Sequence, residues 1–156
     1  MTDPVEAAVA AANRNFYAAF RARDVAAMLS LWVLRGPVSC VHPGWPPMTE
    51  RRQILKSWAE ILSNPGSPRV SCGAETVQVL GPGIATVLAV EVIGGQALAA
   101  TNVFLLEDGH WRIAHHQAGP MAGHFDPDEE DPEEEDDPMD DDLPDDDAGS
   151  GGTVIH

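Results

Sequence analysis

The stretch Ile84–Glu107, IATVLAVEVIGGQALAATNVFLLE, decides the fold. It contains two runs rich in β-branched and apolar residues, Ile84–Ile93 and Gln96–Glu107, joined by Gly94-Gly95. Such runs are typical of β-strands, and a two-residue glycine connection is typical of a hairpin. Because a connection this short joins only antiparallel neighbours, the stretch predicts a pair of antiparallel strands.

Similar strand-like runs lie on either side, at Arg69–Leu80 and Trp111–Ala118. The turn signals Gly81-Pro82-Gly83 and Asp108-Gly109 separate them from the central pair. We therefore predict a four-stranded antiparallel meander. Its strand Ile84–Ile93 is apolar on both alternations, so both faces should be buried. Helices can cover one face, and a second copy of the chain is the most economical cover for the other, which predicts a homodimer.

The periodicity before the meander is helical. Asp3-Pro4-Val5-Glu6 is a helix-start signal for a helix that runs to about Ala22, and Asp24 caps a second, shorter one. A short strand follows at Val38–His42, and Thr49 is the predicted cap of a third helix, Glu50 to about Leu62. Helices followed by a meander predict an α+β fold. Three N-terminal helices packed in the concave face of a strongly curved sheet would form a cone.

The charge of the chain is concentrated at one end. Of its 156 residues with net charge −16, the part from Met1 to Gly123 has nine basic and nine acidic residues, whereas Asp126–Asp147 holds 16 acids. We predict one domain, residues 1–123, and a disordered acidic tail, residues 124–156. The neutral domain favours no nucleic-acid partner. The tail is either a solubilising segment or a contact for a basic partner.

Cysteine content and hydropathy favour an intracellular protein. Cys40 and Cys72 are the two cysteines, too few for a disulfide framework. No apolar run approaches 18 residues, and no secretory signal is evident. We expect a cytoplasmic protein that does not enter membranes.

His42 is the strongest candidate functional residue. It ends the run Ser39-Cys40-Val41-His42-Pro43-Gly44-Trp45, and a residue before proline is held extended. A neutral imidazole, with a pKa of about 6.5, can accept a proton near neutral pH. His42 is either a candidate base in the wall of a pocket or a structural residue hydrogen-bonded to the backbone of the Pro-Gly turn.

Other side chains are assigned by strand alternation and helical spacing. Strict alternation puts His115 on the same face as Trp111, Ile113 and Gln117, so His115 and Gln117 are predicted to point into the cone. Cys40 shares a face with His42, as a small buried residue or as a thiolate paired with the imidazole. The predicted pocket-lining residues are Phe16, Trp32, Cys40, Trp45, Trp58 and Gln117.

Three further assignments complete the candidate list. Glu91 is assigned to a strand edge or an interface, and Tyr17 to the core. The scattered cysteines and histidines include no tight ligand pair such as C-x₂-C, so no metal site is predicted. The chain carries no cofactor signature, and none is expected.

Several motifs together resemble a known family. Cys40–Trp45, Ser57-Trp58, Thr101–Phe104 and Trp111–His116, in this order after a helical hairpin, resemble the SnoaL-like branch of the nuclear transport factor 2-like superfamily. The resemblance spans about Val5 to Pro120. It implies a cystatin-like cone of helices and curved sheet, a pocket inside the cone, and a homodimer through the outer sheet face.

The same resemblance argues against one activity of that superfamily. In its steroid isomerases an aspartate base precedes a proline on the first strand, and His42 stands there in this chain. Their helical tyrosine falls at Phe16, and the protonated aspartate of their oxyanion site falls at Asn102. With all three changed, steroid isomerisation is not expected, although the Asn102 amide can still donate a hydrogen bond.

Two functions remain open from the sequence. The first is a protein that binds a small apolar molecule in the cone, as an isomerase or dehydratase that transfers protons through His42, with His115 and Asn102 as polar partners. The second is a non-catalytic dimerisation module whose acidic tail makes the interactions. An open cavity at His42 would favour the first, and a filled cone would favour the second.

Overall fold

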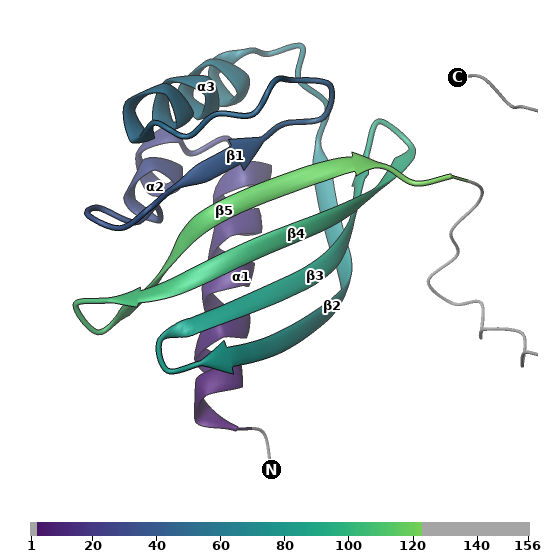
Figure 1. Ribbon diagram of the computed structural model, residues 1–156. Coiled ribbons are helices and arrows are strands. Elements are labelled where there is room, and N and C mark those ends of the chain that lie inside the picture. The colour runs from purple at the N-terminus through teal and green to yellow at the C-terminus, as the bar shows by residue number, and fades with distance from the viewer. Residues whose placement is uncertain (1–2, 123–156) are drawn as a thin grey trace, which may run out of the picture.

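A computed structural model describes residues 3–122 of the chain (Figure 1). The predicted acidic tail therefore lies outside the described residues. The elements follow one another as α1 (Pro4–Ala22), α2 (Val25–Ser30), β1 (Ser39–Val41), α3 (Arg51–Ser63), β2 (Val70–Gly81), β3 (Ile84–Ile93), β4 (Gln96–Glu107) and β5 (His110–Pro120). Every predicted helix and strand is present, with boundaries within a few residues of those expected.

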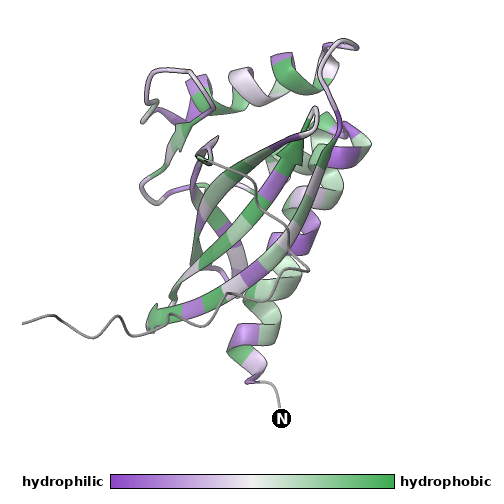
Figure 2. Ribbon diagram, turned by 90° about the vertical axis from the view of Figure 1, so that its right-hand side faces the viewer, coloured by the Kyte–Doolittle hydropathy of each residue, from purple (hydrophilic) through white to green (hydrophobic). Residues whose placement is uncertain are grey.

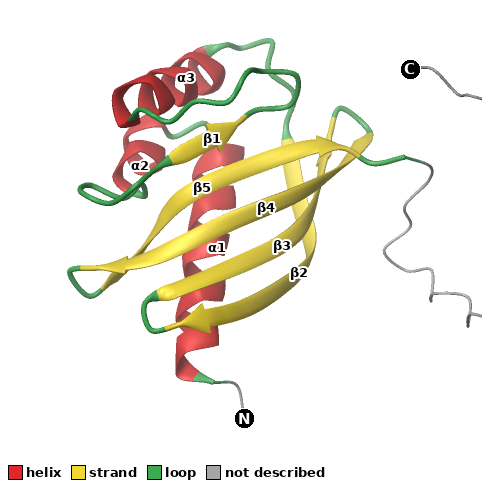
Figure 3. Cartoon of the chain, in the orientation of Figure 1, coloured by secondary structure: helices red, strands yellow, loops and turns green. Residues whose placement is uncertain are grey.

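The strands form one sheet in the order β1-β5-β4-β3-β2. Strands β2 to β5 pair antiparallel with their neighbours in sequence, which confirms the meander. The short strand β1 instead pairs parallel with β5, placing Ser39 opposite His115. The sheet is strongly curved, and α1 crosses its concave side while α2 and α3 lie beyond the β1 edge (Figures 1 and 3). This is the predicted α+β cone.

The helix ends show which local signals act. The carboxylate of Asp3 accepts a hydrogen bond from the Val5 amide at 2.7 Å, as the capping signal predicts. The N-cap of α3 is Glu50 rather than the predicted Thr49, and its side chain makes no capping hydrogen bond. Within residues 3–122, no helix has the length and apolar character needed to cross a bilayer.

The core lies between α1, α3 and the concave face of the sheet. Its largest buried side chains include Phe16, Trp58, Phe104 and Ile113. The strands are coloured mostly hydrophobic, with scattered hydrophilic residues (Figure 2). On the uncovered outer face of β3, Leu88 and Val92 are 43% and 40% exposed, so only one face of this strand is buried within a single chain.

A β-bulge in β5 changes which side chains face the interior. Phe104 pairs with Ile113, but Val103 pairs with His115, so Ala114 is an extra residue in β5. One extra residue reverses the alternation beyond it. The prediction that His115 and Gln117 point into the cone is therefore wrong. His116 takes the interior position at 1% exposure, and Gln117 is exposed.

Candidate functional site

His42 follows β1 and is packed between aromatic rings. Its ring makes edge-to-face contacts with Trp45 and Trp58, at centroid distances of 5.0 and 4.9 Å. The side chain is 3% exposed, and its Nε2 lies 2.8 Å from the hydroxyl oxygen of Ser57 on α3. The interior around His42 is thus filled by protein side chains, which goes against the predicted pocket with His42 as its base.

The hydrogen bonds of Ser57 fix the proton on His42. The Ser57 hydroxyl donates to the carbonyl oxygen of Ile54 at 2.6 Å, so it has no hydrogen left for the imidazole. His42 therefore donates through Nε2–H, which leaves Nδ1 without a proton. Burial lowers the pKa of His42 to about 4, so the ring is neutral near pH 7.

The alternative structural role predicted for His42 involves a different partner. The Pro43-Gly44 turn is closed by the backbone, because the Trp45 amide donates to the His42 carbonyl oxygen at 2.9 Å. The imidazole binds the Ser57 hydroxyl instead of the turn backbone. His42 thus connects the end of β1 to α3.

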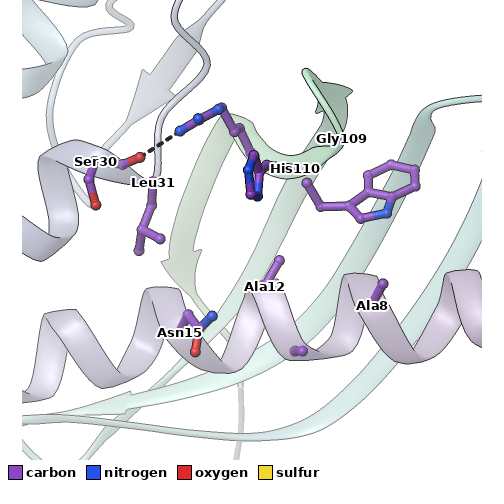
Figure 4. Close-up of a pocket in the computed structure, with 10 residues that line it drawn as sticks. Ala8, Ala12, Asn15, Ser30, Leu31, Gly109 and His110 are labelled. Atoms are coloured by element: carbon purple, nitrogen blue, oxygen red, sulfur yellow. Dashed lines mark hydrogen bonds between the residues drawn. The ribbon is translucent and has the colours of Figure 1, made fainter.

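Surface pockets lined by described residues lie on two sides of the helices. One of about 300 Å³ lies between the loop after β1 and α3, and it is lined by Trp45, Pro46, Met48, Gln53, Lys56, Ser57 and Glu60. Two of these lining residues, Trp45 and Ser57, contact His42, but His42 itself does not line this pocket. A groove of about 460 Å³ lies elsewhere, where Ala8, Ala12 and Asn15 of α1 face Ser30 and His110 (Figure 4).

A buried polar network occupies the concave face of the sheet, with Asn102 of β4 at its centre. The Asn102 amide nitrogen donates to Asn13 Oδ1 at 2.9 Å and to the Tyr17 hydroxyl at 3.1 Å. Its carbonyl oxygen accepts a hydrogen bond from His116 Nδ1–H at 2.6 Å. Burial, and then the nearby His42 and His115, lower the pKa of His116 to about 3, so this ring is also neutral.

The network leaves a donor on α1 available. Asn102 uses both amide hydrogens, and Tyr17 accepts one of them, so the Tyr17 hydrogen takes no part in this bond. Burial first, and the negative charge of Glu91 second, raise the pKa of Tyr17, which keeps the hydroxyl protonated. Among the described residues, Asn13 Nδ2 has no hydrogen-bond acceptor although it is fully buried. Asn13 Nδ2 is thus the unpaired donor of α1 among the described residues, whereas the Tyr17 hydroxyl also interacts with the thiol of Cys72.

Glu91 of β3 is the residue that sequence reasoning misplaced. It is 0% exposed on the concave face, rather than at a strand edge or interface, and neither carboxylate oxygen has a partner among the described residues. Burial raises its pKa to about 7. Its alternation with the buried Ala85, Val87 and Ala89 was a usable signal in the sequence.

The remaining candidates divide between core and surface. Phe16, Trp32, Cys40 and Trp58 are fully buried, whereas Trp45 is 41% exposed at the smaller pocket. The hydroxyl of Ser39 and His115 Nδ1 lie 2.6 Å apart, so this pair is separate from the Asn102 network. Burial raises the pKa of Cys40 to about 12, which argues against a thiolate nucleophile.

The positions of the potential ligand side chains determine whether the described residues can bind a metal ion. Within residues 3–122, no three His, Cys, Asp or Glu side chains come together in a way that could hold a metal ion. The polar groups on the concave side of the sheet include the carboxyl of Glu91, the Tyr17 hydroxyl, the amides of Asn13 and Asn102, and the imidazole of His116.

Comparison with known proteins agrees with this fold. The family model of the SnoaL-like domain matches residues 9–123. F-box protein SKIP8 of Arabidopsis thaliana is 24% identical over 115 residues, which cover 73% of this chain and 50% of that protein. The chain thus spans about half the length of this relative.

Two solved structures are similar at 30% identity. One is a candidate dehydratase of the nuclear transport factor 2-like family from Streptomyces avermitilis, with a TM-score of 0.70 over 78% of this chain and 100% of the other. The second, from Thiobacillus denitrificans, is a candidate calcium/calmodulin-dependent protein kinase type II association domain. Its TM-score is 0.59 over 72% of this chain and 94% of the other. The cone fold and the match over most of the chain place this protein in the SnoaL-like domain family, within the nuclear transport factor 2-like superfamily.

Proposed function

We propose that the chain binds a small, largely apolar molecule in the cone and catalyses proton transfer of the isomerase or dehydratase type. The observation that carries this proposal is Glu91, a fully buried carboxyl without a hydrogen-bond partner among the described residues. An unsatisfied buried acid is destabilising, so it calls for a functional explanation. The similar Streptomyces avermitilis protein, a candidate dehydratase, supports the same class of reaction.

The proposed site combines a proton acceptor, Glu91, with an unpaired donor, the Nδ2–H of Asn13. With a pKa of about 7, Glu91 can both take and return a proton near neutral pH. We expect its carboxylate to take a proton from the carbon next to a carbonyl group. The unpaired Nδ2–H of Asn13 would then donate to the carbonyl oxygen as it gains negative charge.

His42 has a supporting part in this proposal rather than the role of base. Its Nε2–H is engaged by Ser57, and two tryptophans cover its ring. A pKa of about 4 also makes it a weaker base than Glu91 at neutral pH. We assign His42 to holding α3 against β1.

Turnover by a matched pair of variants tests the proposal. The assay follows the absorbance of the conjugated enone product. An unconjugated cyclohexenone gives this product by isomerisation, and a β-hydroxy ketone gives it by dehydration. Glu91→Gln keeps the size of the side chain but cannot take a proton, so turnover should fall about 10²- to 10⁴-fold. Glu60→Gln, on the exposed face of α3, should retain wild-type turnover. Full activity of Glu91→Gln would refute the assignment.

A second candidate function rests on the outer face of the sheet. Leu88 and Val92 are exposed there beside the partly buried Val90 and Val103. Covering these residues with a second copy would support a homodimer and a role as a dimerisation module. The relative named as an F-box protein offers one example of this kind of domain within a longer protein.

A further inference from the structure

The charge balance inside the cone is uneven. The buried polar and charged side chains of the described chain are Asn13, His42, Ser57, Glu91, Asn102 and His116. None of them is a lysine or an arginine, and both histidines are neutral because burial lowers their pKa. Among residues 3–122, the carboxyl of Glu91 thus has no buried cation to pair with.

The groups that interact electrostatically with Glu91 are also uncharged. They come from three elements, namely Tyr17 on α1, Cys72 on β2 and Cys40 on β1. Burial raises the pKa of each, to about 12 for the two thiols, so all three keep their protons at neutral pH. When Glu91 is ionised, none of these neighbouring groups supplies a complementary charge.

The side chains beside Glu91 on the sheet are uncharged and of mixed size. Along β3, Ala89 is a neighbour of Glu91 on the same face. On the adjacent strands, the residues paired with Glu91 are Cys72 and Leu98. Ala100, two residues further along β4, is also small and buried. Cys72 is only half-buried, so the carboxyl lies one strand from solvent.

From this arrangement we infer that the cone binds the protonated amine of a small organic cation, with its ammonium group on the carboxylate of Glu91. An ammonium supplies both the missing charge and three hydrogen-bond donors for the two unpaired oxygens. The nearby ring of Tyr17 adds an attractive aromatic surface for a cation. Carboxylate and phosphate ligands are repelled by the same group.

This inference rests on the proposed function, because it names a ligand class for the same site. An amine paired with the Glu91 carboxylate occupies the base, so it binds in place of the substrate of proton transfer. The test compares three ligands that share one ring: benzylamine, benzyl alcohol and benzoate. Binding to the full chain is measured by calorimetry at about pH 8. We expect benzylamine to bind about tenfold more tightly than benzyl alcohol, and benzoate to bind more weakly than either.

Variants and pH locate the effect at Glu91. Glu91→Gln should abolish the preference for the amine, and Glu60→Gln should keep it. With wild-type protein, benzylamine should bind about tenfold more weakly at about pH 6 than at about pH 8. The reason is that Glu91, with a pKa of about 7, takes up a proton over this range, whereas an alkylamine stays protonated.

Several results would overturn the inference. They are equal affinity for benzylamine and benzyl alcohol, an amine preference that survives Glu91→Gln, or no binding by any primary amine from butylamine to benzylamine. Turnover of a neutral ketone that depends on Glu91 but shows no amine preference would refute the amine and leave the proposed function standing.

Discussion

Replacing Glu91 with glutamine should change how stability depends on pH. In the native protein the pKa of Glu91 is about 7, against 4.5 for an unperturbed glutamate. The native state therefore binds this proton more tightly than the unfolded state does. The stabilisation of the native state by protonation of Glu91 is fully present below about pH 4.5, and it is lost as the pH rises to about 7.

The size of the effect follows from the same two values. At 1.36 kcal/mol per pKa unit, the loss between about pH 4.5 and about pH 8 is on the order of 3 kcal/mol. Glutamine does not titrate, so Glu91→Gln should gain about 3 kcal/mol relative to wild type over this range. An uncharged amide at this position also avoids burying a charge without a partner.

Urea unfolding at a fixed protein concentration measures this difference. Wild type, Glu91→Gln and Glu60→Gln are compared at several values between about pH 4.5 and about pH 8. Glu60 is exposed on α3, so its variant should follow the wild-type curve. A stability difference between Glu91→Gln and wild type that stays constant across the range would show that the Glu91 carboxyl ionises normally, and the reasoning would fail.

Three further expectations can be checked separately. Ser57→Ala removes the acceptor of His42 Nε2–H and should cost about 1–3 kcal/mol in denaturant unfolding, whereas Ser63→Ala on the same helix should change little. Wild-type protein should sediment as a dimer at micromolar concentration, and Leu88→Lys on the outer sheet face should convert it to the 16.7-kDa monomer; a wild-type monomer would contradict the predicted homodimer. Removal of Asp126–His156 should leave the midpoint of thermal denaturation nearly unchanged, because the excess charge lies in that segment, and a large fall would mean that the segment docks on the domain.

The sequence by itself determined the elements and their order. Turn residues such as Gly94-Gly95 and the Asp3 capping signal act within a few residues, so their effect can be read locally. The change from helical to strand periodicity near Arg69 is local in the same sense. These signals are sufficient for the α+β order of elements, and the family followed from the resemblance of motifs such as Cys40–Trp45 and Trp111–His116.

Tertiary structure alone decided which side chains meet inside the cone. The extra residue Ala114 in β5 reverses the alternation, and a bulge depends on pairing with β4 rather than on β5 itself. For this reason His116, and not His115, joins Asn102. Glu91 likewise lacks hydrogen-bond partners among the described residues because none of the strands and helices around it supplies a donor. That outcome depends on the position of every neighbouring element, so the sequence of β3 cannot predict it.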